Sequence, residues 1–255
     1  MITCRLKGGL GNQMFQIATT YTLALKNNDS CCFNFNHCHT PLQGNSSNKY
    51  KDSILSKVNN SDIIIERVGY TEPKFSYDEL PYANGLVLDG YFQSEKYFKE
   101  YRNEIIDLFP INTKNVINFI NGINLENKQI TSVHIRRGDY LSNPEIHSPC
   151  SIEYYNKSIK YIGSSIFIFI SDDIEWVKEN FISDNFYYSP FNDELDDLAL
   201  MVSSDNNIIA NSSFSWWGAW LNRNNKKKVI APKQWFGPLG SKEIYDIIPE
   251  NWIKI

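Results

Sequence analysis

The sequence ITSVHIRRGDY, residues 130–140, carries the clearest structural signal in the chain. Ile130 to Ile135 predicts a buried strand, and two arginines, a glycine and an aspartate follow it. Side chains alternate along a strand, so we expect His134 and Arg136 on one face and Arg137 on the other. Because ligands bind at the carboxyl ends of strands in open α/β sheets, the motif predicts a binding site.

A regular alternation of strands and helices follows this motif. Expected strands cover residues 166–170, 186–188, 207–210 and 228–230, and expected helices cover residues 152–162, 174–180, 194–203 and 214–222. Short apolar strands that alternate with helices form parallel sheets covered on both faces. The second half of the chain is therefore predicted to be doubly wound.

The N-terminal half predicts a second α/β unit. Residues 2–6 predict a strand, Gly8-Gly9-Leu10-Gly11 a tight turn, and residues 12–26 a helix capped by Asn12. We further expect strands at 31–35 and 86–88, a surface excursion at 42–60, a helix at 95–109 and a hinge at 112–127. The prediction is an α/β fold of two lobes, residues 1–120 and 121–255, with a cleft between them.

Composition narrows the functional classes. The chain has 255 residues, of which 42% are hydrophobic, enough for a substantial core. A net charge of −4 gives no electrostatic basis for binding nucleic acid. The N-terminus lacks the features of a signal peptide, and no apolar run approaches the roughly 18 residues of a membrane span. Five irregularly spaced cysteines fit reduced thiols, so we expect a cytoplasmic protein.

Arg136 is the candidate anion ligand in the 130–140 motif. Its guanidinium stays charged and presents a planar fork of donors that suits a pyrophosphate. The alternative is an arginine–aspartate ion pair that locks the loop, with Arg137 and Asp139 as expected partners, since buried charges are usually paired.

The segment Gly8-Gly9-Leu10-Gly11-Asn12-Gln13 differs from the G-x-G-x-x-G dinucleotide motif. Glycines between a strand and a helix nevertheless let backbone amides approach a ligand at the positive end of the helix. The alternative is a tight turn without a ligand, with Asn12 as the N-cap.

Two more polar segments follow predicted strands. Ser171-Asp172-Asp173 offers carboxylates to a ligand or a metal, or alternatively to the first amides of the next helix. The chain contains no D-x-D triplet, so no metal is expected. The segment Asn211 to Trp220 offers the hydroxyls of Ser213 and Ser215 to phosphate oxygens, while its tryptophans are expected in the core.

Two other chemistries are poorly supported. A zinc site is disfavoured because no standard finger spacing fits the soft donors Cys31, Cys32, His37, Cys38 and His39, and a strand with buried thiols is the preferred interpretation. A serine hydrolase is disfavoured because the chain has no G-x-S-x-G elbow.

In these motifs and their order, the chain resembles the family 11 glycosyltransferases, the bacterial and animal α-1,2-fucosyltransferases. The matching segments are LKGGLGNQMFQ (6–16), HIRRGDY (134–140), SDD (171–173) and NSSFSWWGA (211–219). The resemblance implies a GT-B-like fold of two Rossmann-type lobes, with GDP-β-L-fucose as donor and a terminal β-galactoside of an oligosaccharide or glycolipid as acceptor. It also implies inversion to an α-linkage, no cofactor or metal, and a role in lipopolysaccharide biosynthesis at the inner face of the cytoplasmic membrane.

The resemblance also assigns residues. It gives Arg136 the β-phosphate of GDP in a donor-binding lobe at 121–255, and it gives the lobe at 1–120 the acceptor. The other donor-side residues that it implies are His134, Asp172, Asp173, Ser213, Phe214 and Ser215, and those on the fucose and acceptor side are Asn12 and Gln13.

Transfer with inversion needs at most one base for the acceptor hydroxyl. Our hypothesis is Asp139, with Glu145 as the second candidate and a base-free dissociative path as the third. Two other functions stay open: a fucosyltransferase of another linkage, which product analysis would identify, and a non-catalytic sugar-nucleotide or glycan-binding protein, which would bind GDP without transfer.

Overall fold

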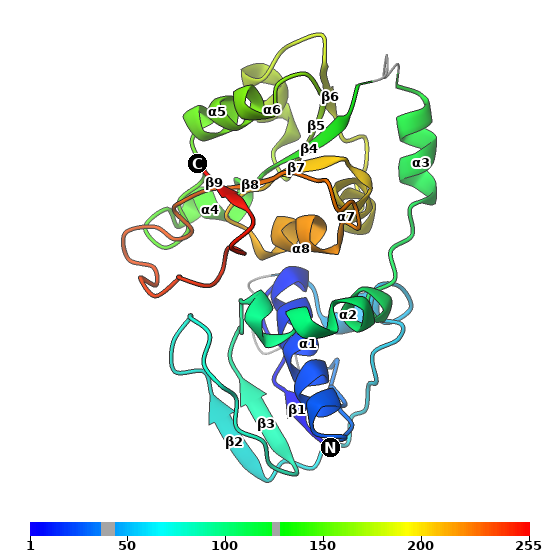
Figure 1. Cartoon of the computed structure of the whole chain (residues 1–255), viewed down its shortest axis with the longest axis vertical. Helices are drawn as coiled ribbons and strands as arrows, with labels where there is room; N and C mark the ends of the chain where they lie inside the picture. Colours follow the sequence, from blue (N-terminus) through cyan, green and yellow to red (C-terminus); the bar gives the residue numbers. More distant parts are fainter. Residues whose placement is uncertain (37–43, 124–127) are drawn as a thin grey trace. The chain divides into compact units, whose positions relative to one another are not determined.

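The computed structural model of the protein describes residues 1–36, 44–123 and 128–255 (Figure 1). The chain divides into two compact units. Unit 1 contains Met1–Ile111 and Glu243–Pro249, and unit 2 contains Asn112–Lys242 and Glu250–Ile255. The sequence placed the boundary after residue 120, whereas the structure places it after Ile111 and returns a short C-terminal segment to unit 1.

Unit 1 is built on a parallel sheet in the order β1-β3-β2. Its strands are β1 (Thr3–Cys4), β2 (Val68–Thr71) and β3 (Leu86–Asp89). Its helices are α1 (Leu10–Lys26), α2 (Arg102–Leu108) and the short 3-10 turns Ser47–Tyr50, Glu95–Tyr97 and Lys99–Tyr101. The expected strand at 31–35 is reduced to isolated bridges, Ile2 with Cys31 and Phe33 with Asn60.

Helix α1 begins earlier than the sequence suggested. Gly9, with an extended backbone, is the N-cap, and its carbonyl accepts hydrogen bonds from the amides of Asn12 and Gln13. Asn12 therefore lies inside the first turn, and its predicted capping role is wrong. The glycine conformation matters at Gly8, whose φ is +77° and where a Cβ would lie 2.4 Å from Nδ2 of Asn12.

The described part of the segment 42–60 is only partly a surface excursion, because buried residues alternate with exposed ones. Residues 42 and 43 lie outside the described residues, but Tyr50, Ile54 and Leu55 are at most 2% exposed. The Asn- and Ser-rich composition concealed these apolar positions. Ser47 is also buried, and its hydroxyl donates to Oε1 of Gln13 at 2.7 Å.

Unit 2 contains a parallel sheet in the order β6-β5-β4-β7-β8-β9. Its strands are β4 (Ile130–Ile135), β5 (Ile166–Ser171), β6 (Phe186–Tyr188), β7 (Asn206–Ile208), β8 (Val229–Ala231) and β9 (Ile253–Lys254). Its helices are α3 (Lys114–Asn121), α4 (Gly138–Ser142), α5 (Ile152–Ile162), α6 (Ile174–Asn180), α7 (Glu194–Ser203) and α8 (Ser213–Leu221). The predicted doubly wound arrangement is confirmed, with α5 and α6 on one face of the sheet and α7 and α8 on the other (Figure 1).

The expected hinge at 112–127 instead contains helix α3, which packs on unit 2. Val116 is fully buried, and the rings of Phe119 and Phe191 lie 5.7 Å apart. Asn115 donates to the carboxylate of Asp196 on α7. Residues 124–127 of the expected hinge lie outside the described residues.

Within the residues that the structure describes, no helix is both long and apolar enough to cross a membrane. In the same residues Cys4, Cys31, Cys32 and Cys150 are free thiols.

Gly218 allows α8 to approach α7 closely, which leads to a stability prediction. A Cβ at this position would lie 2.7 Å from Cβ of Met201. We expect Gly218→Ala to lower the free energy of unfolding by about 1–3 kcal/mol, as overpacking does. Gly69→Ala is the control, because nothing lies within 4 Å of its Cβ. Urea unfolding measures both, and equal effects would contradict the close packing.

Candidate functional site

The turn after β4 holds the guanidinium of Arg136 between two carboxylates. Nη2 of Arg136 lies 2.6 Å from Oδ1 of Asp139, and Nη1 lies 3.0 Å from Oδ2 of Asp172. The guanidinium also lies 5.6 Å from the centre of the Tyr140 ring. The Arg136 side chain is 35% exposed, so solvent and ligands can reach this cluster.

Arg137 has a structural environment of its own. Its Nε donates to Oδ2 of Asp173 at 2.9 Å, and its guanidinium lies 3.6 Å from the centre of the Trp176 ring. The expected pairing of Arg137 with Asp139 is therefore wrong: Asp139 pairs with Arg136. The physical reason is that β4 ends at Ile135 and α4 begins at Gly138, so strand alternation no longer applies to the arginines.

The carboxylates after β5 serve the arginine turn instead of capping α6. Oδ1 of Asp172 accepts the backbone N–H of Arg137 at 2.9 Å, and neither aspartate caps α6 through its side chain. A Cβ at Gly138 would lie 2.4 Å from Oδ2 of Asp172, so glycine is needed for this approach. The described residues contain no group of three or more His, Cys, Asp or Glu placed to hold a metal ion. His37, Cys38 and His39, part of the zinc alternative, lie outside them.

His134 is buried at the end of β4 with an unpaired ring nitrogen. The residue is 5% exposed, and its Nδ1 has no hydrogen-bond partner among the described residues. Burial, together with the charge of Arg136, lowers its pKa to about 3. The imidazole is therefore neutral at physiological pH and lies 5.7 Å from the ring of Phe214 at the start of α8.

The segment Asn211 to Trp220 leads into α8 and forms most of this helix, but its polar groups differ in exposure. Ser215 is fully buried and its hydroxyl hydrogen-bonds to the carbonyl of Ser212 in its own turn. Ser213 and Phe214 are partly exposed at the helix N-terminus. Trp216, Trp217 and Trp220 are at most 2% exposed, which confirms their expected place in the core.

Tyr140 and Asn211 connect two of the sequence motifs, a link that sequence reasoning missed. The hydroxyl of Tyr140 donates to the carbonyl of Asn211 at 2.9 Å. The side-chain amide of Asn211 donates to the carbonyls of Ser148 and Trp235. His147 stacks on Tyr140 with 5.0 Å between ring centroids. Both linking residues lay within the quoted motifs, but nothing in their spacing indicated a contact.

In unit 1, Gln13 and Asn12 differ in burial and in their hydrogen-bond partners. Gln13 is fully buried, and its Nε2 donates to the carbonyls of Gly8 and Asn45 at 2.8 Å. Asn12 is partly exposed, and its Oδ1 accepts from Nε2 of Gln93. Gln13 thus holds two loops together, while Asn12 remains the more accessible of the pair.

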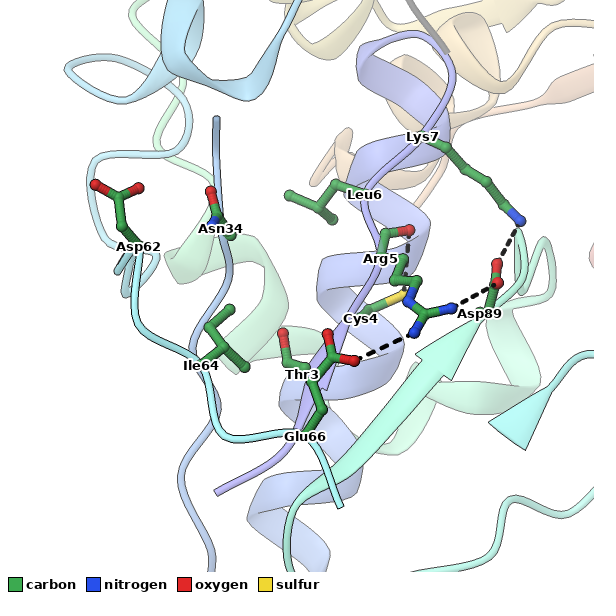
Figure 2. Close-up of a pocket in the computed structure, with 10 residues that line it drawn as sticks. All are labelled: Thr3, Cys4, Arg5, Leu6, Lys7, Asn34, Asp62, Ile64, Glu66 and Asp89. Atoms are coloured by element: carbon green, nitrogen blue, oxygen red, sulfur yellow. Dashed lines mark hydrogen bonds and ion pairs between the residues drawn. The ribbon is translucent and has the colours of Figure 1, made fainter. Parts of the chain in front are cut away.

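Unit 1 also has a cavity of about 660 Å³ beside β1 (Figure 2). Polar and apolar surface contribute about equally to its lining, which comes from β1 and the residues after it, from Asn34, from the end of β3 and from the segment 62–66. The lining residues are Thr3, Cys4, Arg5, Leu6, Lys7, Asn34, Asp62, Ile64, Glu66 and Asp89.

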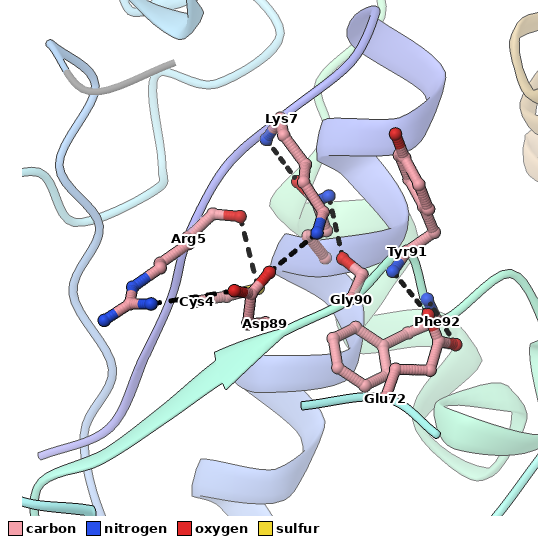
Figure 3. Close-up of polar contacts among 9 residues, drawn as sticks. Cys4, Arg5, Lys7, Glu72, Asp89, Gly90, Tyr91 and Phe92 are labelled. Atoms are coloured by element: carbon pink, nitrogen blue, oxygen red, sulfur yellow. Dashed lines mark hydrogen bonds and ion pairs between the residues drawn. The ribbon is translucent and has the colours of Figure 1, made fainter. Parts of the chain in front are cut away.

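A polar network fixes the strand ends beside this cavity (Figure 3). Asp89 accepts a hydrogen bond from Nζ of Lys7 at 2.6 Å. This bond is the main reason why the pKa of the Asp89 carboxyl is lowered. Gln16 of α1 accepts the amide N–H of Lys7 and donates to the carbonyl of Gly90. Glu72 accepts the amides of residues 91 and 92, and burial raises its pKa.

Comparison with known proteins identifies the chain's relatives. The model of glycosyl transferase family 11 matches residues 1–255. The O-antigen biosynthesis glycosyltransferase WbnK of Escherichia coli is 35% identical, with 100% of both chains covered. An α-1,2-colitosyltransferase of Escherichia coli is 34% identical, covering 100% of this chain and 99% of its own. A galactoside 2-α-L-fucosyltransferase of Caenorhabditis elegans is 25% identical, covering 100% of this chain and 79% of its own.

The fold has a solved counterpart. The structure of the fucosyltransferase NodZ from Bradyrhizobium is 12% identical, covers 86% of this chain and 91% of its own, and has a TM-score of 0.52. Two α/β units with parallel sheets and this counterpart show a GT-B-like fold. The chain belongs to glycosyltransferase family 11. The predicted family and fold class are confirmed.

The buried His134 predicts a pH dependence of stability. Its pKa falls from 6.5 in the unfolded chain to about 3 in the folded protein, so the unfolded state binds more protons between these values. Stability should therefore fall as the pH is lowered through this window. We expect the melting temperature of His134→Gln to fall less than that of wild type between pH 7 and pH 5. Equal slopes by calorimetry would show that His134 does not stay neutral.

Proposed function

We propose that the protein transfers L-fucose from GDP-β-L-fucose to the 2-hydroxyl of a terminal β-galactoside, with inversion and without a metal. The observation that carries the proposal is the Arg136 cluster at the carboxyl end of β4, on a family 11 chain. Breaking the fucose–phosphate bond leaves negative charge on GDP. A pre-positioned guanidinium stabilises that charge in the transition state.

The carboxylates around Arg136 do not prevent this role. Ion pairs with this degree of exposure contribute only about 0–1 kcal/mol, so a diphosphate with two negative charges can exchange for a carboxylate. Asp172 is additionally fixed by the amide of Arg137, which supports a role in orienting the guanidinium.

The neighbouring groups suit the remainder of the nucleotide. The imidazole of His134 is neutral and its Nδ1 is unpaired. This nitrogen can accept one hydrogen bond from a base, or donate one to a base or a phosphate. The backbone amides of Ser213 and Phe214, at the start of α8, can donate hydrogen bonds to phosphate oxygens. The buried Ser215 hydroxyl supports the turn, so we assign the serine contact to Ser213.

Asp139 remains our proposal for the base, but its contact with Arg136 restricts which of its oxygens can accept the proton. One of its oxygens accepts from Arg136, so proton acceptance would fall to the other. Glu145 is exposed, and its backbone carbonyl anchors the loop by accepting the amide of Leu239 at 2.8 Å. It stays the second candidate beside a base-free dissociative path.

Colitose is the second candidate for the transferred sugar. The observation favouring it is the 34% identity to an α-1,2-colitosyltransferase over the whole chain. The similarity to WbnK supports an acceptor in O-antigen biosynthesis, and we therefore place the enzyme in the cytoplasm at the inner face of the membrane.

The first test of the transferase proposal is GDP release with EDTA present. Wild-type protein given GDP-fucose and lactose or N-acetyllactosamine should release GDP only with the acceptor, and Arg136→Ala should lose at least about 10²-fold in kcat, as loss of one charge-stabilising donor does. Lys157→Ala, an exposed cation paired with Glu153, should match wild type. A parallel reaction with nucleotide-activated colitose identifies the preferred sugar, and linkage analysis of the product identifies the position. GDP binding without transfer of either sugar would favour a non-catalytic binder.

The variant Asp139→Asn tests whether Asp139 is the catalytic base or only positions Arg136. If Asp139 is the base, we expect kcat to fall about 10²–10⁴-fold with little change in the Kd for GDP, and the acidic limb of the pH–rate profile to disappear. If the residue only positions Arg136, GDP binding weakens and the pH profile keeps its shape. Glu145→Gln is the matched comparison.

A further inference from the structure

We propose that Tyr140 is a positioning residue for the donor diphosphate: it holds the turn that carries Arg136 and the start of α8 at a fixed separation, so that one diphosphate can contact both. The inference rests on the proposed function, which assigns the phosphates to Arg136 and to the first amides of α8. Tyr140 acts without touching the substrate. It joins two binding elements through a hydrogen bond between residues that are 71 positions apart in the chain.

The first argument is the place of the Tyr140 side chain between the two elements. The centre of its ring lies 5.6 Å from the guanidinium carbon of Arg136, and its hydroxyl donates to the carbonyl of Asn211 at 2.9 Å. Asn211 stands two residues before Ser213, where α8 begins. One side chain thus contacts the arginine turn with its ring and the approach to α8 with its hydroxyl.

The second argument is that Asn211 is itself held firmly. The residue is 3% exposed, and its side-chain amide donates to the carbonyls of Ser148 and Trp235 at 2.9 and 2.8 Å. Its Oδ1 accepts from Sγ of Cys150 at 3.3 Å. These contacts come from two separate segments of the chain. The carbonyl that accepts from Tyr140 is therefore a fixed point at the start of α8.

The third argument is that the ring of Tyr140 is also fixed. His147 stacks on it with 5.0 Å between ring centroids, and Phe236 lies 5.6 Å from His147. The loops that carry these two rings are joined where the amide of Gly237 donates to the carbonyl of Ile146 at 2.8 Å. Burial is the main cause that raises the pKa of Tyr140, so its hydroxyl stays protonated and remains a donor at physiological pH.

The charges around Arg136 explain why such a link matters. The guanidinium already pairs with Asp139 and Asp172, so a diphosphate gains little from it alone. A ligand gains from two groups together when their separation is fixed before it binds, because ordering them during binding costs free energy. A monophosphate that contacts only one of the two groups does not need that separation. Tyr140 should therefore favour nucleoside diphosphates over monophosphates.

The first test compares GDP with GMP by titration calorimetry in wild type and Tyr140→Phe, a change that removes only the hydroxyl. We expect the Kd for GDP to rise about two- to tenfold, the effect of one lost hydrogen bond. The Kd for GMP should stay unchanged, because GMP lacks the phosphate assigned to Arg136. Melting temperatures establish that the variant is folded.

The matched control is Tyr188→Phe, which removes a hydroxyl that donates to the carbonyl of Phe181 at 2.6 Å. This variant should bind both nucleotides like wild type. An equal loss of GDP and GMP affinity in Tyr140→Phe would show a merely structural role and overturn the proposal. An unchanged GDP affinity would overturn it as well.

A double-mutant cycle tests whether Tyr140 acts through Arg136. Tyr140→Phe should weaken GDP binding less in an Arg136→Ala background than in wild type, because no guanidinium is left to position. Residues that act on one ligand together give such non-additive effects, whereas independent residues give additive ones. Additive losses of GDP affinity would contradict the proposed link.

The transfer reaction separates this inference from the proposed activity. Tyr140→Phe should lower kcat at least about tenfold, because small displacements of binding groups are costly, and leave the KM for the acceptor unchanged. If the GDP and GMP pattern appears while wild type transfers neither fucose nor colitose, the positioning role stands and the proposed activity fails. If wild type transfers fucose and Tyr140→Phe binds GDP equally well, the positioning role fails and the activity stands. If wild type binds no GDP, both fail.

Discussion

The arginines after β4 need counter-charges, and the site in unit 2 depends on where those charges come from. They come from the turn after β5, the neighbouring strand, where Asp172 and Asp173 meet Arg136 and Arg137 respectively. The parallel pairing of β4 with β5 brings both strand ends to the same edge, so each arginine meets one aspartate of the β5 turn, and Arg136 also meets Asp139 of α4. Arg137 is the more buried partner and packs on Trp176, so its pair anchors the turn while Arg136 keeps its exposed face.

In unit 1, neutral side chains hold the loops at the strand ends. Gln13 and Gln16 project from α1 into loops that have few apolar residues, and each satisfies backbone groups from two different segments. A buried amide that uses both its oxygen and its nitrogen recovers the cost of its own burial. The loops at the strand ends are thereby held by hydrogen bonds as well as by packing. Gln13 therefore has a structural role where the family resemblance pointed to a ligand.

Much of the fold could be predicted from the sequence, because unit 2 obeys simple periodicity. The bounds of α5, α6, α7 and β6 agree with the expected ranges, since apolar strands and amphipathic helices alternate with few exceptions there. Unit 1 was harder. An Asn- and Ser-rich composition hid the buried Tyr50 and Ile54, and the edge pairing at Cys31 is a single bridge that no periodicity reveals. The structure brings the motifs after β4 and β5 together, but the predicted partner of Arg137 is wrong, because the chain changes from strand to helix between Ile135 and Gly138 and the arginines no longer alternate.

The charge balance around Arg136 has a consequence for how a donor would be recognised. Arg136 is fully compensated by Asp139 and Asp172, so the cluster offers no strong net positive field to attract any passing anion. A ligand must displace a carboxylate, and it gains only if other groups bind it together with the guanidinium. The neutral imidazole of His134 and the amides at the start of α8 are such groups, and both lie on elements adjoining the arginine turn. Specificity for a nucleotide sugar over free phosphate then follows from the requirement that several contacts form at once, each weak by itself.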